Sequence, residues 1–546
     1  MLHRRLKVTA AVAGVALLVA ACGGGQGGSA KGSADAADEG TPQAGGSVIY
    51  GIENESNGGW CLPESQLAIS GIQVARAIYD TLMVPAQSGE MMPFLATSVT
   101  PNDTFDRWTI KLRKGVKFHD GTDLTAEVVK NNLDAYRGKY EGRSATLFSF
   151  VFDNVDTVKA TDPLTVTVTT KTPWPSFPNF LFFEGRIGIM GQSQLDDATN
   201  CDKALVGTGP FRKREWKLNN RFVAEKNADY WQTDADGTRL PYLDEITFVS
   251  MLNDGDSVES LQMGRYDLMH TSTGEDLERV EALADAGTIN VLSTSDFADV
   301  TYVMFNESKP PFDNMDARLA VSQAIDRDEF VKLRTAGRQP VASGPFAPGS
   351  IGYLKNSGFP AYNRDEAKQH VAAYERETGK QLGFTMLHGG DPGSLTSMEL
   401  VQSQLAEVGI DMKLTPADQA ALIDQVIAGG FDAVFWRNHP GGDPDGQFVW
   451  WRSDSPVNFG RYQDPTIDRL LAAGRAEPDA AKRKTIYEDL NRRFAQQAHN
   501  VWLMWSAWAV SSQPKVHGIL GPDIDGEPPF EGLAVGHPVS GLWVEQ

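Results

Sequence analysis

Short apolar segments and amphipathic helical segments alternate along the chain from residue 46 onward, and this alternation limits the folds open to it. Residues 46–52 are typical of a strand, whereas 71–82 carry apolar side chains at helical spacing. Farther along, strand-like segments at 384–387, 411–414 and 431–436 lie between helical segments at 364–378, 395–408, 416–428, 465–475 and 479–498. Strands that alternate with helices favour parallel crossover units covered by helices, so the sequence predicts the α/β class.

Length and charge narrow the class further. A chain of 546 residues is expected to form two or three domains, and no internal repeat indicates a solenoid. The net charge of -21 argues against nucleic acid as a partner, because a phosphate backbone needs a basic face. The hydrophobic fraction of 41% and mean hydropathy of -0.31 are those of a globular protein with ample core.

The N-terminus has the pattern of a secretory signal. Arg4, Arg5 and Lys7 precede an apolar run over 8–21 that ends at Cys22. Residues 18–23 resemble the bacterial lipobox, which implies that residues 1–21 are removed and that Cys22 carries the lipid anchor; the alternative is a simple secretory signal with an incidental cysteine. Residues 22–44, rich in Gly, Ser, Ala and Asp, are expected to be a flexible tether. The expected location is the extracytoplasmic face of the cell membrane.

The remaining cysteines, Cys61 and Cys201, form an even pair in an oxidising compartment, so we expect a disulfide between them. The alternative, a catalytic thiol, would need an activating base, and the local sequence supplies none.

Several local structures can be predicted in more detail. Residues 108–113 read as a half-buried strand that turns at 114–115 and pairs back through 116–118. Asp120–Thr122 is expected to cap the helix that follows. His119–Gly121 is therefore interpreted as part of a turn and cap and not as a catalytic group. One helix is predicted over 314–331.

An ordered set of motifs carries a family resemblance. The motifs are 108–121 (WTIKLRKGVKFHDG), 207–211 (GTGPF), 227–231 (NADYW), 311–314 (PFDN) with Arg318, 324–326 (AID), and Tyr362–Asn363 with Ala367. Together with the lipobox they resemble the extracytoplasmic solute-binding proteins of the peptide/nickel class, family 5, of ABC importers. The resemblance spans nearly all of the chain after the signal segment, and the first motif is highly specific.

The resemblance implies a two-lobed periplasmic-binding-protein fold that closes around a ligand by bending at a hinge. The implied division is lobe I at 45–303 with an extra subdomain at about 86–200, lobe II at 304–505, and a return to lobe I at 506–546. Strands 300–305 and 503–510 would cross the hinge. On the second of these, alternation would place Trp502 and Trp508 on one face and Trp505 on the other.

The resemblance also implies a role without chemistry: a monomer binds a small solute and delivers it to membrane permease subunits, with no cofactor and no metal. Peptide-binding relatives pair the ligand's ammonium with an Asp placed just after the strand that corresponds to 431–436. Here Pro440 or Gly441 stands in its place. Asp443 is the nearest carboxylate, and it either substitutes or only caps the loop before Gln447.

Aromatic and polar residues crowd the same region and the end of the first strand, and flat rings stack on sugars, rings or planar amides. The candidate ligand-binding residues are Trp436, Asn438, His439, Asp443 and Trp450 from lobe II, and Glu53, Asn54 and Trp60 from lobe I. Ordinary core packing is the alternative for each Trp. His439 lacks a second ligand at metal spacing, which makes a nickel site a weak hypothesis.

Two functional hypotheses therefore stand. The first is capture of di- or oligopeptides, with a non-peptide solute such as an oligosaccharide, aromatic acid or metal chelate as its variant. The second, more remote, is a secreted lipoprotein hydrolase, but the chain has no His-Glu-x-x-His, no Gly-x-Ser-x-Gly and no Walker loop.

Overall fold

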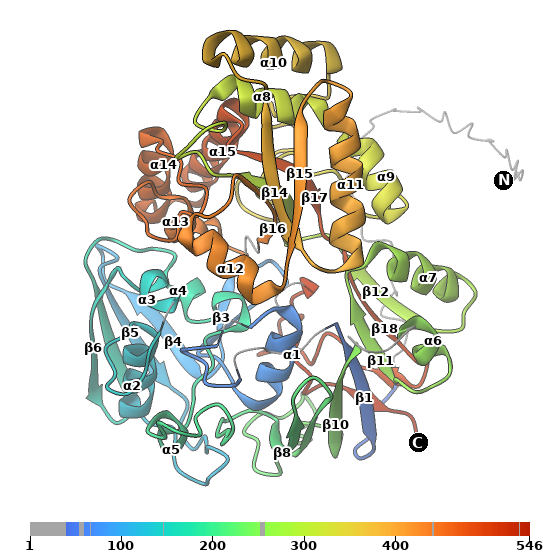
Figure 1. Cartoon of the computed structure of the whole chain (residues 1–546). Coiled ribbons are helices and arrows are strands. Elements are labelled where there is room, and N and C mark those ends of the chain that lie inside the picture. The colour runs from blue at the N-terminus through green and yellow to red at the C-terminus, as the bar shows by residue number, and fades with distance from the viewer. Residues whose placement is uncertain are drawn as a thin grey trace, which may run out of the picture.

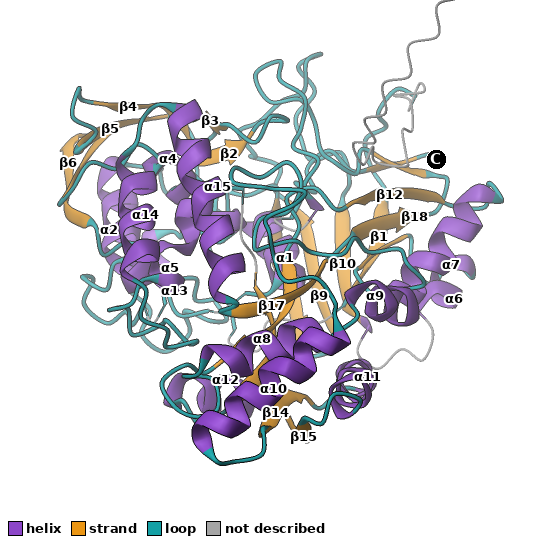
Figure 2. Ribbon diagram, turned by 90° about the horizontal axis from the view of Figure 1, so that it is seen from above, coloured by secondary structure: helices purple, strands orange, loops and turns teal. Residues whose placement is uncertain are grey.

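The computed structural model describes residues 40–53, 59–65, 67–145, 147–251, 257–438, 442–533 and 536–546. The candidates Cys22, Asn54 and His439 lie outside these ranges. Figures 1 and 2 show two large α/β bodies, called lobes I and II below, with a smaller sheet attached to one side. This arrangement confirms the predicted α/β class with two lobes.

Lobe I is built on a seven-stranded sheet in the order β12-β18-β11-β1-β10-β9-β8. Its strands are β1 (Ser47–Ile52), β8 (Phe211–Lys217), β9 (Arg221–Lys226), β10 (Glu245–Ser250), β11 (Leu268–Thr271), β12 (Asn290–Thr294) and β18 (Trp508–Ser512). The central β1 runs parallel to β10 and β11, whereas the other pairs are antiparallel. Its helices are α1 (Ile69–Ile78), α6 (Ser257–Gln262) and α7 (Gly274–Asp285), and a short pair, β19 (Val516–His517) and β20 (Trp543–Val544), lies near the C-terminus.

Lobe II is built on a five-stranded sheet in the order β15-β14-β16-β13-β17. Its strands are β13 (Val300–Phe305), β14 (Gly383–Gly389), β15 (Asp411–Ala417), β16 (Ala433–Asn438) and β17 (Asn500–Trp505). Its helices are α8 (Met315–Ala324), α9 (Arg327–Thr335), α10 (Arg364–Thr378), α11 (Pro392–Ala406), α12 (Gln419–Ala428), η3 (Pro444–Gln447), α13 (Phe448–Trp451), α14 (Pro465–Ala476) and α15 (Ala480–Gln497). The predicted parallel crossovers are present where β14 pairs with β15 and β16, but antiparallel pairing at β13 makes the sheet mixed.

The third body, called the side unit below, is a four-stranded sheet in the order β4-β5-β7-β6. Its elements are β4 (Ala96–Pro101), β5 (Arg107–Leu112), β6 (Val155–Asp162), β7 (Thr165–Thr170), α2 (Ala126–Tyr136), α3 (Phe148–Val151), α4 (Phe177–Phe180), η1 (Phe183–Gly185) and α5 (Gln192–Leu195), with the hairpin β2 (Met83–Pro85) and β3 (Met91–Pro93) before it. Alternate residues of β5 are buried, as its sequence pattern predicts. In Figures 1 and 2 this unit lies next to α13 and α14 of lobe II.

The chain passes between the two large sheets twice, from β12 to β13 and from β17 to β18. The two crossings are joined at Asp299, which is fully buried. Its backbone oxygen accepts from Ser506 N at 2.9 Å, and its Oδ1 accepts from Trp508 Nε1 at 2.9 Å. The structure thus places 300–305 and 503–510 where the lobes join, while the exact domain limits remain predictions.

Three local predictions are wrong. Residues 116–118 do not pair with β5, whose partners are β4 and β7. Thr125, not Asp120–Thr122, caps α2, because Thr125 Oγ1 accepts from Val128 N, while Asp120 caps only the turn to Thr122. The helix expected over 314–331 is two helices, because α8 ends at Ala324 and Asp326 caps α9 by accepting from Glu329 N.

The predicted alternation of Trp502, Trp505 and Trp508 along one strand also fails. Trp502 and Trp505 belong to β17 in lobe II, and Trp508 belongs to β18 in lobe I. All three are buried. Among the described residues, no helix has the length and apolar character that crossing a bilayer requires.

Candidate functional site

Arg437 lies where the two large sheets meet. It is the next-to-last residue of β16, and its side chain is 36% exposed while its partner Asp299 is fully buried. The guanidinium forms an ion pair with Asp299, donates from Nη1 to Ser272 Oγ at 3.2 Å, and lies 4.8 Å from the ring of Trp508. Because Ser272 and Trp508 follow or belong to strands of lobe I, this cation spans the junction of the lobes.

Glu53, a predicted site residue, joins the same group from the end of β1. Its Oε1 accepts hydrogen bonds from Ser272 N at 2.5 Å and Ser272 Oγ at 2.9 Å. Burial raises the pKa of the Glu53 carboxyl, and Arg437 and the Ser272 hydrogen bonds offset part of that rise. Ser272 therefore connects a carboxylate of lobe I to a cation of lobe II, and groups of both signs lie within one small region.

The predicted aromatic residues of lobe II form a separate cluster. Trp436 precedes Arg437 in β16, so the two side chains point to opposite faces of the sheet. The rings of Trp436 and Trp450 both pack on Phe459, with centroids 6.0 and 5.7 Å away, and both are partly exposed. Asn438 Nδ2 donates to Gln447 Oε1 at 2.7 Å, which holds the end of β16 against η3.

Asp443 has the second of the two roles that the sequence left open, because its Oδ1 caps η3 by accepting from Asp445 N at 2.9 Å. Arg483 also donates to both of its oxygens, at 2.7 and 2.5 Å. In this structure Asp443 therefore stabilises the loop, and its contact with a ligand stays a prediction.

Trp60 is a core residue. Its ring is fully buried and packs edge-on against Trp216 and Phe222 of the β8–β9 pair. This is the core packing that the sequence left open as the alternative for each Trp.

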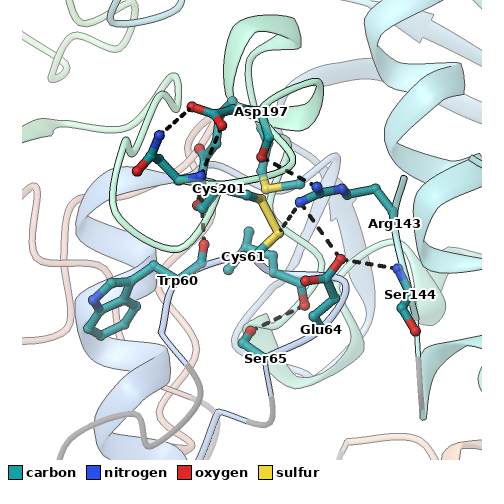
Figure 3. The surroundings of a disulfide bond; sticks show 12 residues. Trp60, Cys61, Glu64, Ser65, Arg143, Ser144, Asp197 and Cys201 are labelled. Carbon is teal, nitrogen blue, oxygen red and sulfur yellow. Dashed lines mark hydrogen bonds and ion pairs between the residues drawn. A yellow bond between two sulfur atoms is a disulfide. The ribbon is translucent and has the colours of Figure 1, made fainter. Parts of the chain in front are cut away.

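The expected disulfide between Cys61 and Cys201 is present, with an S–S distance of 2.01 Å. Figure 3 shows Arg143 beside it, with Nη1 donating to Cys61 Sγ at 2.9 Å and Nη2 to the Asp197 oxygen at 3.3 Å. Glu64 completes the surroundings by pairing with Arg143 at 3.7 Å and accepting from Ser144 N at 3.1 Å. The disulfide thus joins the segment after β1 to the side unit.

A small pocket lies between the side unit and lobe II. It is lined by Pro85, Gly89, Met91, Asn179, Phe180, Phe182, Phe183, Glu184, Gly442, Asp443, Gly446 and Phe530. The walls are mainly apolar, and Asn179, Glu184 and Asp443 are the polar side chains among them. Asp443 is the predicted site residue that reaches this pocket, on the side that lobe II forms.

Arg437, Ser272 and Asp299 were not predicted from the sequence as a group. Arg437 stands between two predicted candidates, so its position was a usable signal. Its partners were not visible, because they lie 138 and 165 residues away in the chain. Among the described residues, no cluster of three or more His, Cys, Asp or Glu side chains could hold a metal ion.

Two mixed α/β lobes, joined by two strand crossings and with charged groups of both signs at their junction, are the architecture of a two-lobed ligand-binding protein. The sequence profile of the bacterial extracellular solute-binding proteins, family 5, matches residues 90–459. The chain belongs to this family, and it is therefore a solute-binding protein of the kind that serves ABC importers.

Individual relatives agree with this assignment. The glutathione-binding protein GsiB of Pectobacterium atrosepticum is 27% identical over 463 residues, which cover 82% of this chain and 86% of the relative. The solved structure of the binding protein AgaA from A. tumefaciens R10 with agropinic acid has a TM-score of 0.79 at 23% identity and covers 92% of this chain and 99% of that one. The periplasmic binding protein DppA of Helicobacter pylori with the peptide STSA has a TM-score of 0.78 at 21% identity, with 92% and 99% covered. The two structures show the shared fold.

Proposed function

We propose that this protein captures short peptides between its lobes and delivers them to the permease of an ABC importer, without chemical change to the ligand. Support comes from the family assignment and from the curated relative that is named for binding glutathione, itself a small peptide. The observation that carries the peptide assignment is the pairing of Glu53 and Arg437 through Ser272 at the lobe junction.

A zwitterionic peptide needs one acceptor for its ammonium group and one cation for its carboxylate. In this proposal the ligand's carboxylate binds the partly exposed Arg437, because guanidinium and carboxylate groups form strong paired hydrogen bonds. Glu53 takes the ammonium in place of the Asp that the family resemblance leads one to expect near Pro440 and Gly441. Trp436, Asn438 and Trp450 border the ligand from lobe II, and the predicted His439 and Asn54 belong to the same proposal.

A non-peptide ligand remains the second candidate, and the apolar pocket between the side unit and lobe II favours it. Phe180, Phe183 and Phe530 provide ring faces there, which would suit an aromatic acid. Such a ligand would not need an ammonium acceptor, so the two candidates differ in whether an ammonium group is required.

Thermal unfolding of a Cys22→Ser variant, which lacks the proposed lipid site, tests the ligand class. The panel is reduced glutathione, the dipeptide Met-Leu, an oligosaccharide, an aromatic acid and nickel with histidine. A ligand at a hundred times its dissociation constant adds about 2.7 kcal/mol of stability. A shift with the peptides supports the proposal, whereas a shift only with the aromatic acid or the sugar replaces it by the second candidate.

Two variants test the assigned roles by calorimetric titration of the ligand that binds. Arg437→Met is expected to weaken binding by roughly 10- to 100-fold, since a hydrogen bond to a charged group contributes about 1.5–3 kcal/mol. Arg364→Met is the matched control, because Arg364 pairs with Glu407 on the exposed surface of lobe II. Equal affinity in the two variants would remove Arg437 from the site.

The membrane attachment is also proposed, through acylation of Cys22 and a tether over 22–44. Cell fractionation of the wild type and of Cys22→Ser tests it. The wild type is expected in the membrane fraction and the variant in the soluble fraction, and equal distribution of the two would contradict lipidation. The delivering species is proposed to be a monomer, which light scattering on the same variant measures.

A further inference from the structure

A buried carboxylate links lobe II to the side unit. Asp445, in η3, is fully buried, and its Oδ2 accepts hydrogen bonds from Trp174 Nε1 at 2.6 Å and from Ser176 Oγ at 2.5 Å. Its Oδ1 accepts from Arg475 Nε at 2.8 Å. Both oxygens are therefore satisfied, one within lobe II by α14 and one across the gap by the segment that precedes α4.

The two halves of this contact belong to bodies that are separately anchored. Trp174 N donates to Phe105 O at 2.8 Å, and Trp108 of β5 lies 5.5 Å from the Phe177 ring, so the donor segment is part of the side unit. The side unit is in turn fixed to lobe I, for example where His119 N donates to Gly207 O at 2.8 Å. Opening of the lobes would therefore separate Trp174 and Ser176 from Asp445.

A second polar contact crosses the same boundary. Asn179 Nδ2 donates to Asp443 Oδ2 at 3.1 Å, and both residues line the pocket between the side unit and lobe II. The boundary is also packed, because the Arg475 guanidinium lies 4.9 Å from the ring of Trp174 and 3.6 Å from that of Phe448. These contacts form beside the cavity and are complete in the protein alone.

Breaking the contact leaves no unpaired buried charge. Asp445 keeps its ion pair with Arg475, because both lie in lobe II. The indole N–H and the hydroxyl that are released can bind water. This contact can therefore form and break reversibly, because breaking it leaves no buried charge without a partner. Breaking a buried ion pair would leave such a charge, at a large cost in free energy.

We propose that Asp445, Trp174 and Ser176 form a latch that favours the closed arrangement of the lobes before any ligand binds. The latch sets the fraction of closed protein, and that fraction scales the apparent affinity for every ligand alike. Specific recognition stays with other residues. This inference rests on the proposed function, in which closing of the lobes encloses the ligand.

The test removes only the donors on the side unit, in a Trp174→Phe/Ser176→Ala variant that retains Asp445 and Arg475. A second buried carboxylate supplies a matched control. Asp80 accepts from Trp231 Nε1 at 2.9 Å and from Thr208 Oγ1 at 2.9 Å, so an indole and a hydroxyl also donate to this carboxylate within lobe I. The control variant is therefore Trp231→Phe/Thr208→Val.

Distance measurement between two spin labels reports the closed fraction without a ligand. Labels at Leu218→Cys in lobe I and Ile427→Cys in lobe II use side chains that are 60% and 51% exposed. The latch variant is expected to lower the ratio of closed to open protein about tenfold, since its two lost hydrogen bonds end on a charged acceptor. The control variant is expected to keep the wild-type distribution.

Binding of reduced glutathione, measured by calorimetry, gives the second readout. Its affinity is expected to fall in the latch variant by the same factor as the closed fraction, and to stay unchanged in the control. An unliganded wild type that is already fully open, or a latch variant with an unchanged distance distribution, overturns the latch. Glutathione that fails to bind the wild type bears on the proposed ligand and not on the latch, because the distance measurement needs none. If the double variant does not fold, Ser176→Ala alone is expected to show about a threefold shift.

Discussion

The disulfide offers a direct test of how the chain is held together, through replacement of Cys61 and Cys201 by Ala. The bond closes a loop with a sequence separation of 140 residues. In the chain-entropy description, a loop of that length restricts the unfolded chain by about 5 kcal/mol at 25 °C. Both side chains are buried, at 3% and 4% exposure, and their replacement by Ala also removes the sulfur that accepts a hydrogen bond from Arg143 Nη1.

Urea unfolding followed by circular dichroism measures the loss in the Cys22→Ser background. The double variant is expected to lose about 3–5 kcal/mol, and the reduced wild type a similar amount. Cys61→Ala and Cys201→Ala alone should each lose nearly as much as the double variant, because each breaks the same bond. A loss below about 1 kcal/mol, or two single losses that add up to the double, would refute the reasoning.

Three further predictions concern stability. Burial raises the pKa of Asp80 to about 6, so the protonated carboxyl stabilises the fold fully below about pH 4, and this stabilisation is lost as the pH rises through 6. The free energy of unfolding of the wild type, measured in urea, should therefore fall by about 3 kcal/mol between pH 4 and 7 because of this group, and Asp80→Asn should remove that fall. Asn363 accepts from Asp365 N at 3.1 Å at the start of α10, and Asn363→Ala should cost about 1 kcal/mol in the same assay, whereas no loss would contradict the cap. A Cβ on Gly207 would lie 1.9 Å from a backbone oxygen, so Gly207→Ala should lower the stability by about 3 kcal/mol or more. A Cβ on Gly442 meets nothing within 4 Å, so Gly442→Ala should leave the stability nearly unchanged. Equal thermal stability of the two variants would refute the steric argument.

Local sequence patterns predicted an element well where residues at its own ends determine its limits. The helix over 364–378 matches α10 because Asn363 caps it and Gly379 ends it with a positive φ of 68°. The helix expected over 314–331 was too long, since the side chain of Asp326 starts a new helix inside an apolar pattern that continues across the break. The periodic pattern of apolar residues reports which side chains are buried. It does not show where one helix ends and the next begins when both bury the same kind of face.

The site was less predictable, because its groups come together only through the packing of the lobes. Glu53, a predicted ligand-binding residue, lies at the lobe junction, yet its neighbours Ser272 and Arg437 could not be inferred from its own surroundings in sequence. Asp443 looked free in the sequence because Arg483, its partner, lies on a helix 40 residues later. The ion-pair partner of a charged residue can be distant in sequence, and it is identified only once the fold is known.

The position of β18 has a consequence for how the chain can acquire its structure. Residues 508–512 do not add to an edge of the seven-stranded sheet but lie between β11 and β12, which are formed from 268–271 and 290–294. Until the ribosome has released the last part of the chain, these two strands have no common partner and the sheet of lobe I is split. Lobe II, whose strands all lie within 300–505, can be complete earlier. The nascent protein is therefore expected to finish its second lobe before its first, and a chain that stops at 505 should retain a folded lobe II beside an unfinished sheet.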